Sequence, residues 1–146
     1  MKIALASDHG GINIRNEIRA LLEELHIEYV DMGCDCEDSV DYPDYALPAA
    51  EMVAKGEVDR AILICGTGIG MSIAANKVKG IRCALCHDVF SAKATRQHND
   101  TNVLAMGERV IGPGLAREIA SVWLTTEFEG GRHENRVGKI TSYENK

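Results

Sequence analysis

The stretch Ala61-Ile62-Leu63-Ile64-Cys65-Gly66-Thr67-Gly68-Ile69-Gly70 indicates the fold class of this chain. Its apolar half is typical of a parallel strand that is buried on both faces. The three alternating glycines allow a sharp turn and bring backbone N–H groups close to a ligand. The segment Met71–Lys77 that follows has helix-forming composition. The stretch therefore predicts a strand, a tight turn and a helix, with the Cys65 thiol at the carboxyl end of the strand.

Strand and helix patterns alternate along the whole chain. Strands are predicted over Lys2–Ala6, Glu28–Met32, Arg60–Cys65, Ile81–Cys86 and Val103–Met106. Helices are predicted over Ile14–Leu25, Tyr45–Lys55, Met71–Lys77, Val89–Gln97, a segment opened by Gly112-Pro113-Gly114, and Arg132–Tyr143. This alternation predicts an α/β fold: a three-layer αβα sandwich around a Rossmann-like, five-stranded parallel sheet.

The length of 146 residues predicts a single domain, 1–146, with one core. Residues 129–146 form a C-terminal helical arm with few apolar residues, so we expect it to contact a second subunit. The net charge of −6 argues against a nucleic-acid binder. No apolar run approaches the ~20 residues that span a bilayer, and the N-terminus does not resemble a signal peptide. We therefore expect a cytoplasmic protein without membrane contact.

The glycine loop does not match the common phosphate-binding motifs. A P-loop counted from Gly66 requires glycine where Met71 stands, and a cysteine phosphatase loop counted from Cys65 requires arginine at the same place. A dinucleotide fingerprint should follow the first strand, whereas this loop follows the third. A nicotinamide-dependent oxidoreductase is therefore only an alternative, which cofactor binding would test.

The other four of the five cysteines do not indicate a metal site or a disulfide framework. Cys83 and Cys86 lie on a predicted strand, where residues three apart point to opposite faces and cannot chelate together. We expect both to be buried structural cysteines. The pair Cys34 and Cys36 resembles a ligand pair, but its role stays open.

Three polar clusters are candidates for the same ligand-binding edge of the sheet as Cys65. Asp8-His9 follows the first strand, and Arg96–Asp100 is predicted between the fourth helix and the fifth strand. Arg132 and Arg136 lie four residues apart in the arm, so a helix places them on one face, where guanidinium groups suit a phosphate.

Each of these groups also has a purely structural interpretation. Asp8 could cap the first helix, and His98 could interact with the dipole at a helix C-terminus. The arginine pair could be a solvated face, and Cys65 could be buried and inert.

Five motifs, in order, carry a family resemblance over nearly the whole chain. They are Ser7-Asp8-His9-Gly10-Gly11, Asp41-Tyr42-Pro43-Asp44-Tyr45-Ala46, Ile64 to Lys77, Arg96 to Leu104, and Gly130-Gly131-Arg132-His133-Glu134-Asn135-Arg136. Together they resemble ribose-5-phosphate isomerase type B, in the sugar-phosphate isomerase family that also includes galactose-6-phosphate isomerase subunits.

The resemblance implies an aldose–ketose isomerase that uses neither cofactor nor metal. It implies that Cys65 is the base that moves a proton through an enediolate, that Thr67 assists it, and that His98 opens the furanose ring. The N–H groups of Gly66, Gly68, Ile69 and Gly70 then hold the developing oxyanion. Further substrate-binding positions implied by the resemblance are Asp8, His9, Tyr42, Asn99, Arg109, Arg132 and Arg136.

The paired His98-Asn99 and the arginine arm favour a pentose phosphate, because galactose-6-phosphate isomerase subunits generally lack both. The expected reaction interconverts D-ribose 5-phosphate and D-ribulose 5-phosphate, a step of the pentose phosphate pathway. Allose 6-phosphate, galactose 6-phosphate and a tetrulose phosphate stay open as substrates, as does a non-catalytic sugar-phosphate-binding module. The resemblance also implies a homodimer or homotetramer whose sites take residues from two subunits.

Overall fold

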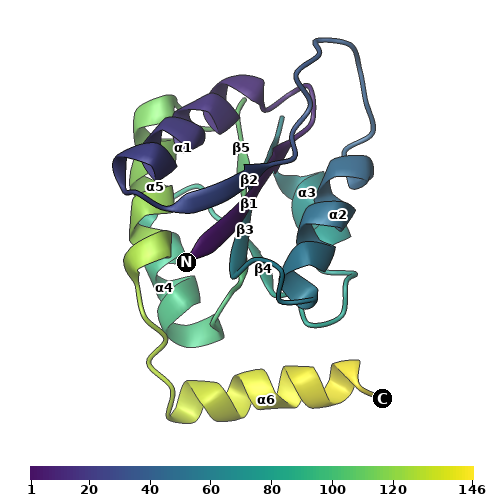
Figure 1. The fold of residues 1–146 in the computed structure, drawn as a ribbon. Coiled ribbons are helices and arrows are strands. Elements are labelled where there is room, and N and C mark those ends of the chain that lie inside the picture. The colour runs from purple at the N-terminus through teal and green to yellow at the C-terminus, as the bar shows by residue number, and fades with distance from the viewer.

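Five parallel strands form one sheet in the order β2-β1-β3-β5-β4 in the computed structural model, which describes all of residues 1–146 (Figure 1). The strands are β1 (Lys2–Ser7), β2 (Glu28–Asp31), β3 (Arg60–Cys65), β4 (Cys83–Leu85) and β5 (Val103–Gly107). Every pairing is parallel, and β3 pairs with β1 on one side and β5 on the other. The predicted five-stranded α/β sheet is confirmed.

Six helices surround or flank the sheet. They are α1 (Ile12–Glu24), α2 (Pro43–Ala54), α3 (Ile69–Ala75), α4 (Val89–Asn99), α5 (Pro113–Thr125) and α6 (Arg132–Glu144). Helices α1, α4 and α5 cover one face and α2 and α3 the other, while α6 lies apart, below the end of the sheet where the strands begin (Figure 1). None of these helices is long and apolar enough to cross a membrane.

A separate apolar core fills each side of the sheet. On the α1 and α5 side, large residues such as Leu5, Ile62 and Trp123 are fully buried. On the α2 and α3 side, the strands present small residues such as Ala4 and Ala61, which allow the helices to pack close to the sheet. The Cys65 side chain belongs to this second core, so it points toward α2 and α3.

Several boundaries differ from the predicted ones. Helix α2 begins at Pro43 rather than Tyr45, with Pro43 in the first turn, where its missing N–H costs nothing. Pro48 therefore lies inside the helix, where it removes one backbone hydrogen bond. Helix α3 begins two residues earlier than Met71. The edge strand β4 is shorter than Ile81–Cys86 because it pairs with β5 over only three residues.

The two cysteines near β4 point to opposite faces of the sheet, as predicted. Cys83 packs against the core beneath α2 and α3, whereas Cys86 lies in the core beneath α1 and α5. Cys86 is buried as expected, but Cys83 is only half-buried by surface exposure. Burial raises the pKa of the Cys86 thiol to about 11 and that of Cys83 further, so both stay protonated at neutral pH.

The strand order makes the carboxyl ends of β1 and β3 the expected ligand-binding position. From β1 the chain continues outward to β2, whereas from β3 the sheet continues the other way to β5 and β4. The loops that leave β1 and β3 therefore diverge at the carboxyl edge. Open parallel sheets bind ligands at such a switch point. Asp8–Gly11 and Gly66–Gly68 form these two loops.

Candidate active site

Cys65 ends β3, and its sulfur contacts the glycine turn that follows. The side chain is buried, with the residue only 6% exposed. The backbone N–H of Gly68 donates to Cys65 Sγ over 3.1 Å. Gly68 is the N-cap of α3 and has a φ of 76°, a left-handed conformation that favours glycine. The turn thus fixes the thiol at the point where β3 becomes α3.

Glycine is also required here because the loop after β3 and the end of β5 meet without space between them. A Cβ atom on Gly68 would lie 2.8 Å from the carbonyl carbon of Met106. A Cβ atom on Gly107 would lie 2.7 Å from Cα of Thr67. The loop after β3 therefore rests directly on the end of β5, and a side chain at either glycine would separate them.

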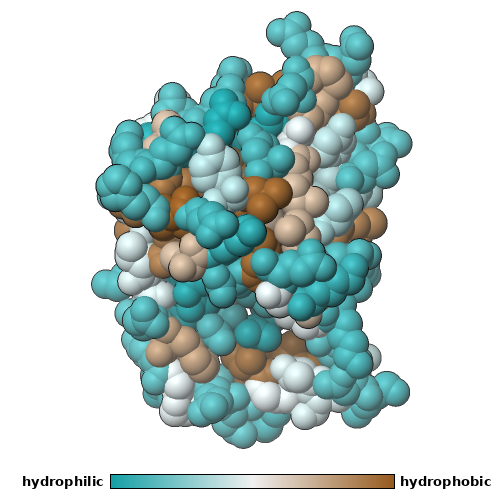
Figure 2. All heavy atoms as spheres, viewed as in Figure 1, coloured by the Kyte–Doolittle hydropathy of each residue, from teal (hydrophilic) through white to brown (hydrophobic).

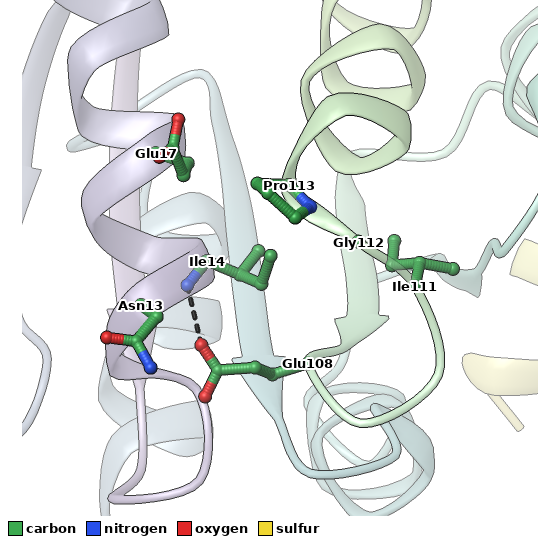
Figure 3. A pocket seen from close by; sticks show the side chains of 7 residues that line it. All are labelled: Asn13, Ile14, Glu17, Glu108, Ile111, Gly112 and Pro113. Atoms are coloured by element: carbon green, nitrogen blue, oxygen red, sulfur yellow. Dashed lines mark hydrogen bonds between the residues drawn. The ribbon is translucent and has the colours of Figure 1, made fainter.

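The β5–α5 loop carries Arg109 to the glycine loop. The N–H of Glu108 donates to the Cys65 carbonyl at 2.9 Å, and that of Arg109 donates to the Gly66 carbonyl at 3.0 Å. The Glu108 carboxylate accepts the Ile14 N–H of α1 at 2.7 Å (Figure 3). These bonds hold the exposed Arg109 side chain beside Gly66, where it has no ion-pair partner.

Asp8 lies in the loop after β1, beside the glycine loop, and does not cap the first helix. Its carboxylate accepts the Gly10 N–H at 2.8 Å and the residue is 6% exposed. The N-cap of α1 is Gly11, without a side-chain hydrogen bond, so the capping interpretation is wrong. A Cβ on Gly10 would lie 3.1 Å from the Gly66 nitrogen, which places the Asp8 turn against the glycine loop.

His9 and Tyr42 are joined to the site through the loop between β2 and α2. The N–H of Val40 donates to His9 Nδ1 at 3.2 Å. The Tyr42 ring lies over Gly70, since a Cβ there would lie 2.7 Å from the ring carbon that bears the hydroxyl. This loop therefore orients His9 through Val40 and carries Tyr42.

One chain brings together ten of the fourteen candidate residues at the carboxyl edge. They are Asp8, His9, Tyr42, Cys65, Gly66, Thr67, Gly68, Ile69, Gly70 and Arg109. Thr67 is exposed, and its hydroxyl accepts the Ile69 N–H at 3.3 Å. The arrangement offers a thiol beside backbone donors, a carboxylate and a guanidinium, which suits proton transfer on an anionic substrate.

His98 and Asn99 lie at the opposite edge of the sheet from Cys65, so the expectation that they share its edge is wrong. Both belong to the last turn of α4, not to the connection before β5. Helix α4 begins after the carboxyl end of β4 and runs back for 11 residues, about 16 Å at 1.5 Å per residue. It therefore ends where β5 begins.

Arg132 and Arg136 lie with His98 at this amino edge, on α6. The His133 ring stacks on that of His98, with ring centroids 4.3 Å apart and planes inclined by 16°. His133 is the buried residue of α6, and both arginines are exposed. Burial, followed by the charges of His98 and Arg132, lowers the pKa of His133.

Neither cavity of the chain contains Cys65. One of about 250 Å³ lies beside Ile14 and Glu108 (Figure 3). Another of about 370 Å³ lies between α6 and the amino edge, with Asn99 and Ile140 in its lining, and the hollow is visible in Figure 2. The carboxyl-edge site is therefore an open surface in a single chain.

Four exposed apolar side chains on α3, β4 and α4 were not predicted. Ile69 and Ile73 on α3 are 50% and 55% exposed, and Phe90 at the start of α4 is 81% exposed. Leu85 at the end of β4 is 38% exposed and contacts the position of Gly68. The four-residue spacing of Ile69 and Ile73 was the available signal, but sequence alone does not show that this helix face is uncovered.

Comparisons with known proteins match this chain to sugar phosphate isomerases. The family model described as Ribose/Galactose Isomerase matches residues 3–140. The chain is 78% identical to a Bacillus subtilis protein named "Putative sugar phosphate isomerase YwlF", covering 100% of this chain and 99% of that one. It is 52% identical to ribose-5-phosphate isomerase B of Escherichia coli (98% and 96% covered) and 45% identical to D-erythrulose-4-phosphate isomerase of Pectobacterium atrosepticum (99% and 95% covered).

Solved structures agree with the fold. The chain matches ribose-5-phosphate isomerase B of Clostridium thermocellum with a TM-score of 0.97, at 54% identity and with 99% and 98% of the two chains covered. It matches the Mycoplasma genitalium ribose-5-phosphate isomerase B with bound ribulose-5-phosphate with a TM-score of 0.96, at 40% identity and 99% and 97% coverage. The chain therefore belongs to the ribose/galactose isomerase family and is a sugar phosphate isomerase.

Proposed function

We propose that this protein interconverts D-ribose 5-phosphate and D-ribulose 5-phosphate through an enediolate. The observation that carries the proposal is the Cys65 thiol at the carboxyl end of β3, fixed against a turn of backbone N–H donors. Relatives named ribose-5-phosphate isomerase B support the substrate, since one of them has a structure with bound ribulose-5-phosphate. No cofactor or metal is part of the proposed reaction.

Cys65 is the proposed base that takes the proton from C2 of the open-chain sugar and returns it to C1. A positioned acid–base group typically contributes about 10²–10⁴-fold to the rate. Negative charge then develops on the sugar oxygens, which the N–H groups of the Gly66–Gly70 turn stabilise; one such donor is typically worth about 3–4 kcal/mol. Thr67, whose hydroxyl accepts the Ile69 N–H in this turn, is proposed to assist Cys65.

Asp8, His9 and Tyr42 are proposed to hold the sugar, with Arg109 binding phosphate from the same chain. Guanidinium groups bind phosphate oxygens in pairs, so an exposed, unpaired Arg109 suits this role. Phosphate binding away from the reacting carbons orients the substrate and supplies binding energy to the reaction.

A second copy of the chain is proposed to supply His98, Asn99, Arg132 and Arg136. Within one chain these residues lie at the opposite sheet edge from Cys65. The exposed apolar residues Ile69 and Ile73 follow the glycine loop on α3, and Leu85 contacts the position of Gly68, so a second subunit seated there would cover them. In a homodimer, or a tetramer of such dimers, His98 would open the furanose ring and the arm arginines would bind the phosphate.

Complementation between two inactive variants tests the shared site. Cys65→Ala and His98→Ala chains are each expected to be inactive as homodimers. Mixed by refolding, they form heterodimers in which one of the two sites has both Cys65 and His98, so activity returns. If mixing restores no activity although heterodimers form, the two residues do not meet across subunits.

The substrate is tested by comparing kcat/KM for ribose 5-phosphate, allose 6-phosphate, galactose 6-phosphate and erythrose 4-phosphate in the presence of a chelator. We expect ribose 5-phosphate to be preferred. The relative named D-erythrulose-4-phosphate isomerase makes the tetrose pair the second candidate. A preference for erythrose 4-phosphate would replace the proposed substrate, and no turnover of any of the four would refute it.

A further inference from the structure

Cys34 and Cys36 lie next to the proposed substrate site but take no part in the isomerase chemistry. Their sulfur atoms are 2.8 Å apart, the closest approach between free cysteines in the chain. Cys34 is buried, 4% exposed, whereas Cys36 is exposed. The outer side of the pair consists of the exposed residues Asp35–Ser39, so a small solute in water can reach it.

Cys34 is held firmly by the end of β1. Its N–H donates to the Ser7 carbonyl at 3.0 Å, and its own carbonyl accepts from the fully buried Arg15 at 2.6 Å. The same guanidinium pairs with Asp35, the residue between the two cysteines. Arg15 thus fixes the short turn that keeps both sulfurs on one side.

The two thiols are chemically unequal. A hydrogen bond from Cys36 lowers the pKa of Cys34, and Tyr45 and the Arg15 charge act in the same direction. The same contact raises the pKa of Cys36. The Cys36 N–H also donates to Cys34 Sγ at 3.3 Å, a contact that stabilises a thiolate on Cys34. Thiolates are the reactive form of cysteine, so this geometry and the pKa directions both favour Cys34 as the nucleophile and Cys36 as the proton donor.

We propose that Cys34 and Cys36 form a peroxide-sensitive dithiol that closes into a disulfide and weakens substrate binding through the loop that follows it. The Cys34 thiolate attacks one oxygen of hydrogen peroxide and breaks the O–O bond, giving Cys34 sulfenic acid and, after protonation, water. The Cys36 sulfur then attacks the Cys34 sulfur and displaces hydroxide, which takes the Cys36 proton and leaves as a second water. Two thiols lose two electrons to one peroxide.

Bond formation requires the sulfurs to approach from 2.8 Å to about 2.05 Å. The ring spans only three residues, and strained, exposed disulfides of this kind are the readily reduced, regulatory ones. Since Cys34 is anchored, Cys36 and the residues after it must move. That segment includes Val40, which donates to His9, and Tyr42, which covers Gly70. The effect on substrate binding therefore rests on the proposed function, whereas formation of the disulfide does not.

Mass spectrometry tests the disulfide without reference to activity. The tryptic peptide Ala20–Lys55 contains Cys34 and Cys36 and no other cysteine. After stoichiometric peroxide, we expect this peptide to lose two hydrogen atoms in the wild-type protein and in Cys65→Ala, and to regain them with dithiothreitol. Cys36→Ser should instead accumulate a single added oxygen on Cys34. If the wild-type peptide keeps both thiols while Cys65 is oxidised, the proposal is wrong.

Kinetics test the effect on substrate binding, with Cys36→Ser as the matched control. Oxidation of Cys65 lowers kcat in both proteins, so the comparison is of KM for ribose 5-phosphate in the remaining active enzyme. We expect KM to rise by about tenfold in the wild type only, reversibly with dithiothreitol, equivalent to about 1.4 kcal/mol. A disulfide that forms with KM unchanged would disprove the link to the site. Absence of turnover before oxidation would contradict the proposed function instead.

Discussion

Gly68→Ala measures how tightly the Cys65 turn is packed. The backbone there has a φ of 76°, and an alanine Cβ would lie 2.6 Å from Leu85 Cδ1 and 2.8 Å from the Met106 carbonyl carbon. Left-handed backbone costs an ordinary residue about 1–2 kcal/mol. Overpacking against a backbone that cannot rotate away costs about 1–3 kcal/mol more. We therefore expect a total destabilisation of about 2–5 kcal/mol.

Gly56→Ala is the matched control, because Gly56 has a φ of 73° but open space around its Cβ position. Gly56→Ala should lower the free energy of unfolding only by the cost of the left-handed backbone, about 1–2 kcal/mol. Urea unfolding followed by circular dichroism gives both free energies, with equal m-values required for the comparison. The Gly68 variant should also lose about 10²-fold in kcat because the Cys65 sulfur and the N–H groups shift. Equal destabilisation of the two variants would refute the packing argument.

Three further predictions concern the base, a half-buried histidine and the core. Cys65→Ala should lower kcat for ribose 5-phosphate by at least about 10²-fold while calorimetry still detects ligand binding; an active variant would refute the assignment of Cys65 as the base. Burial lowers the pKa of His87, whose Nε2 accepts the Gly107 N–H at 3.0 Å. The unfolded chain therefore binds the proton first, and stability should fall as the pH drops below the ordinary value of 6.5. His87→Gln, which keeps an acceptor but does not titrate, should flatten this dependence in urea unfolding at pH 7.5 and 5.5; an unchanged slope would assign it to other groups. Trp123→Phe should cost about 2–4 kcal/mol of unfolding free energy, because Trp123 is fully buried and its Nε1–H donates to Thr101 Oγ1 at 3.0 Å; a loss under about 1 kcal/mol would show that the core repacks.

The sequence by itself determined the alternation of strands and helices and the position of Cys65 in its glycine turn. These features depend on local patterns: apolar runs bounded by glycine, amphipathic periods and a proline at the start of a helix. Boundaries such as those of α2 and β4 depended on tertiary contacts, which is why Pro48 lies inside a helix and β4 is only three residues long. For the same reason, the exposure of Ile69 and Ile73 could not be predicted, because it depends on which parts of the chain pack against α3.

Only the tertiary structure decided which candidate residues share an edge of the sheet. Sequence order suggested that His98 and Asn99 belong with Cys65, yet a helix that follows a parallel strand returns to the edge where the strands begin. Helix α4 is long enough to place His98 and Asn99 at that edge. Helix α6 lies at the same edge because the His133 ring stacks on that of His98. The carboxyl-edge residues instead meet because β1 and β3 are neighbours in the sheet, and this strand order could not be predicted from the sequence. The glycine turn was thus readable locally, whereas the division of the candidate site between two edges follows from the direction of α4.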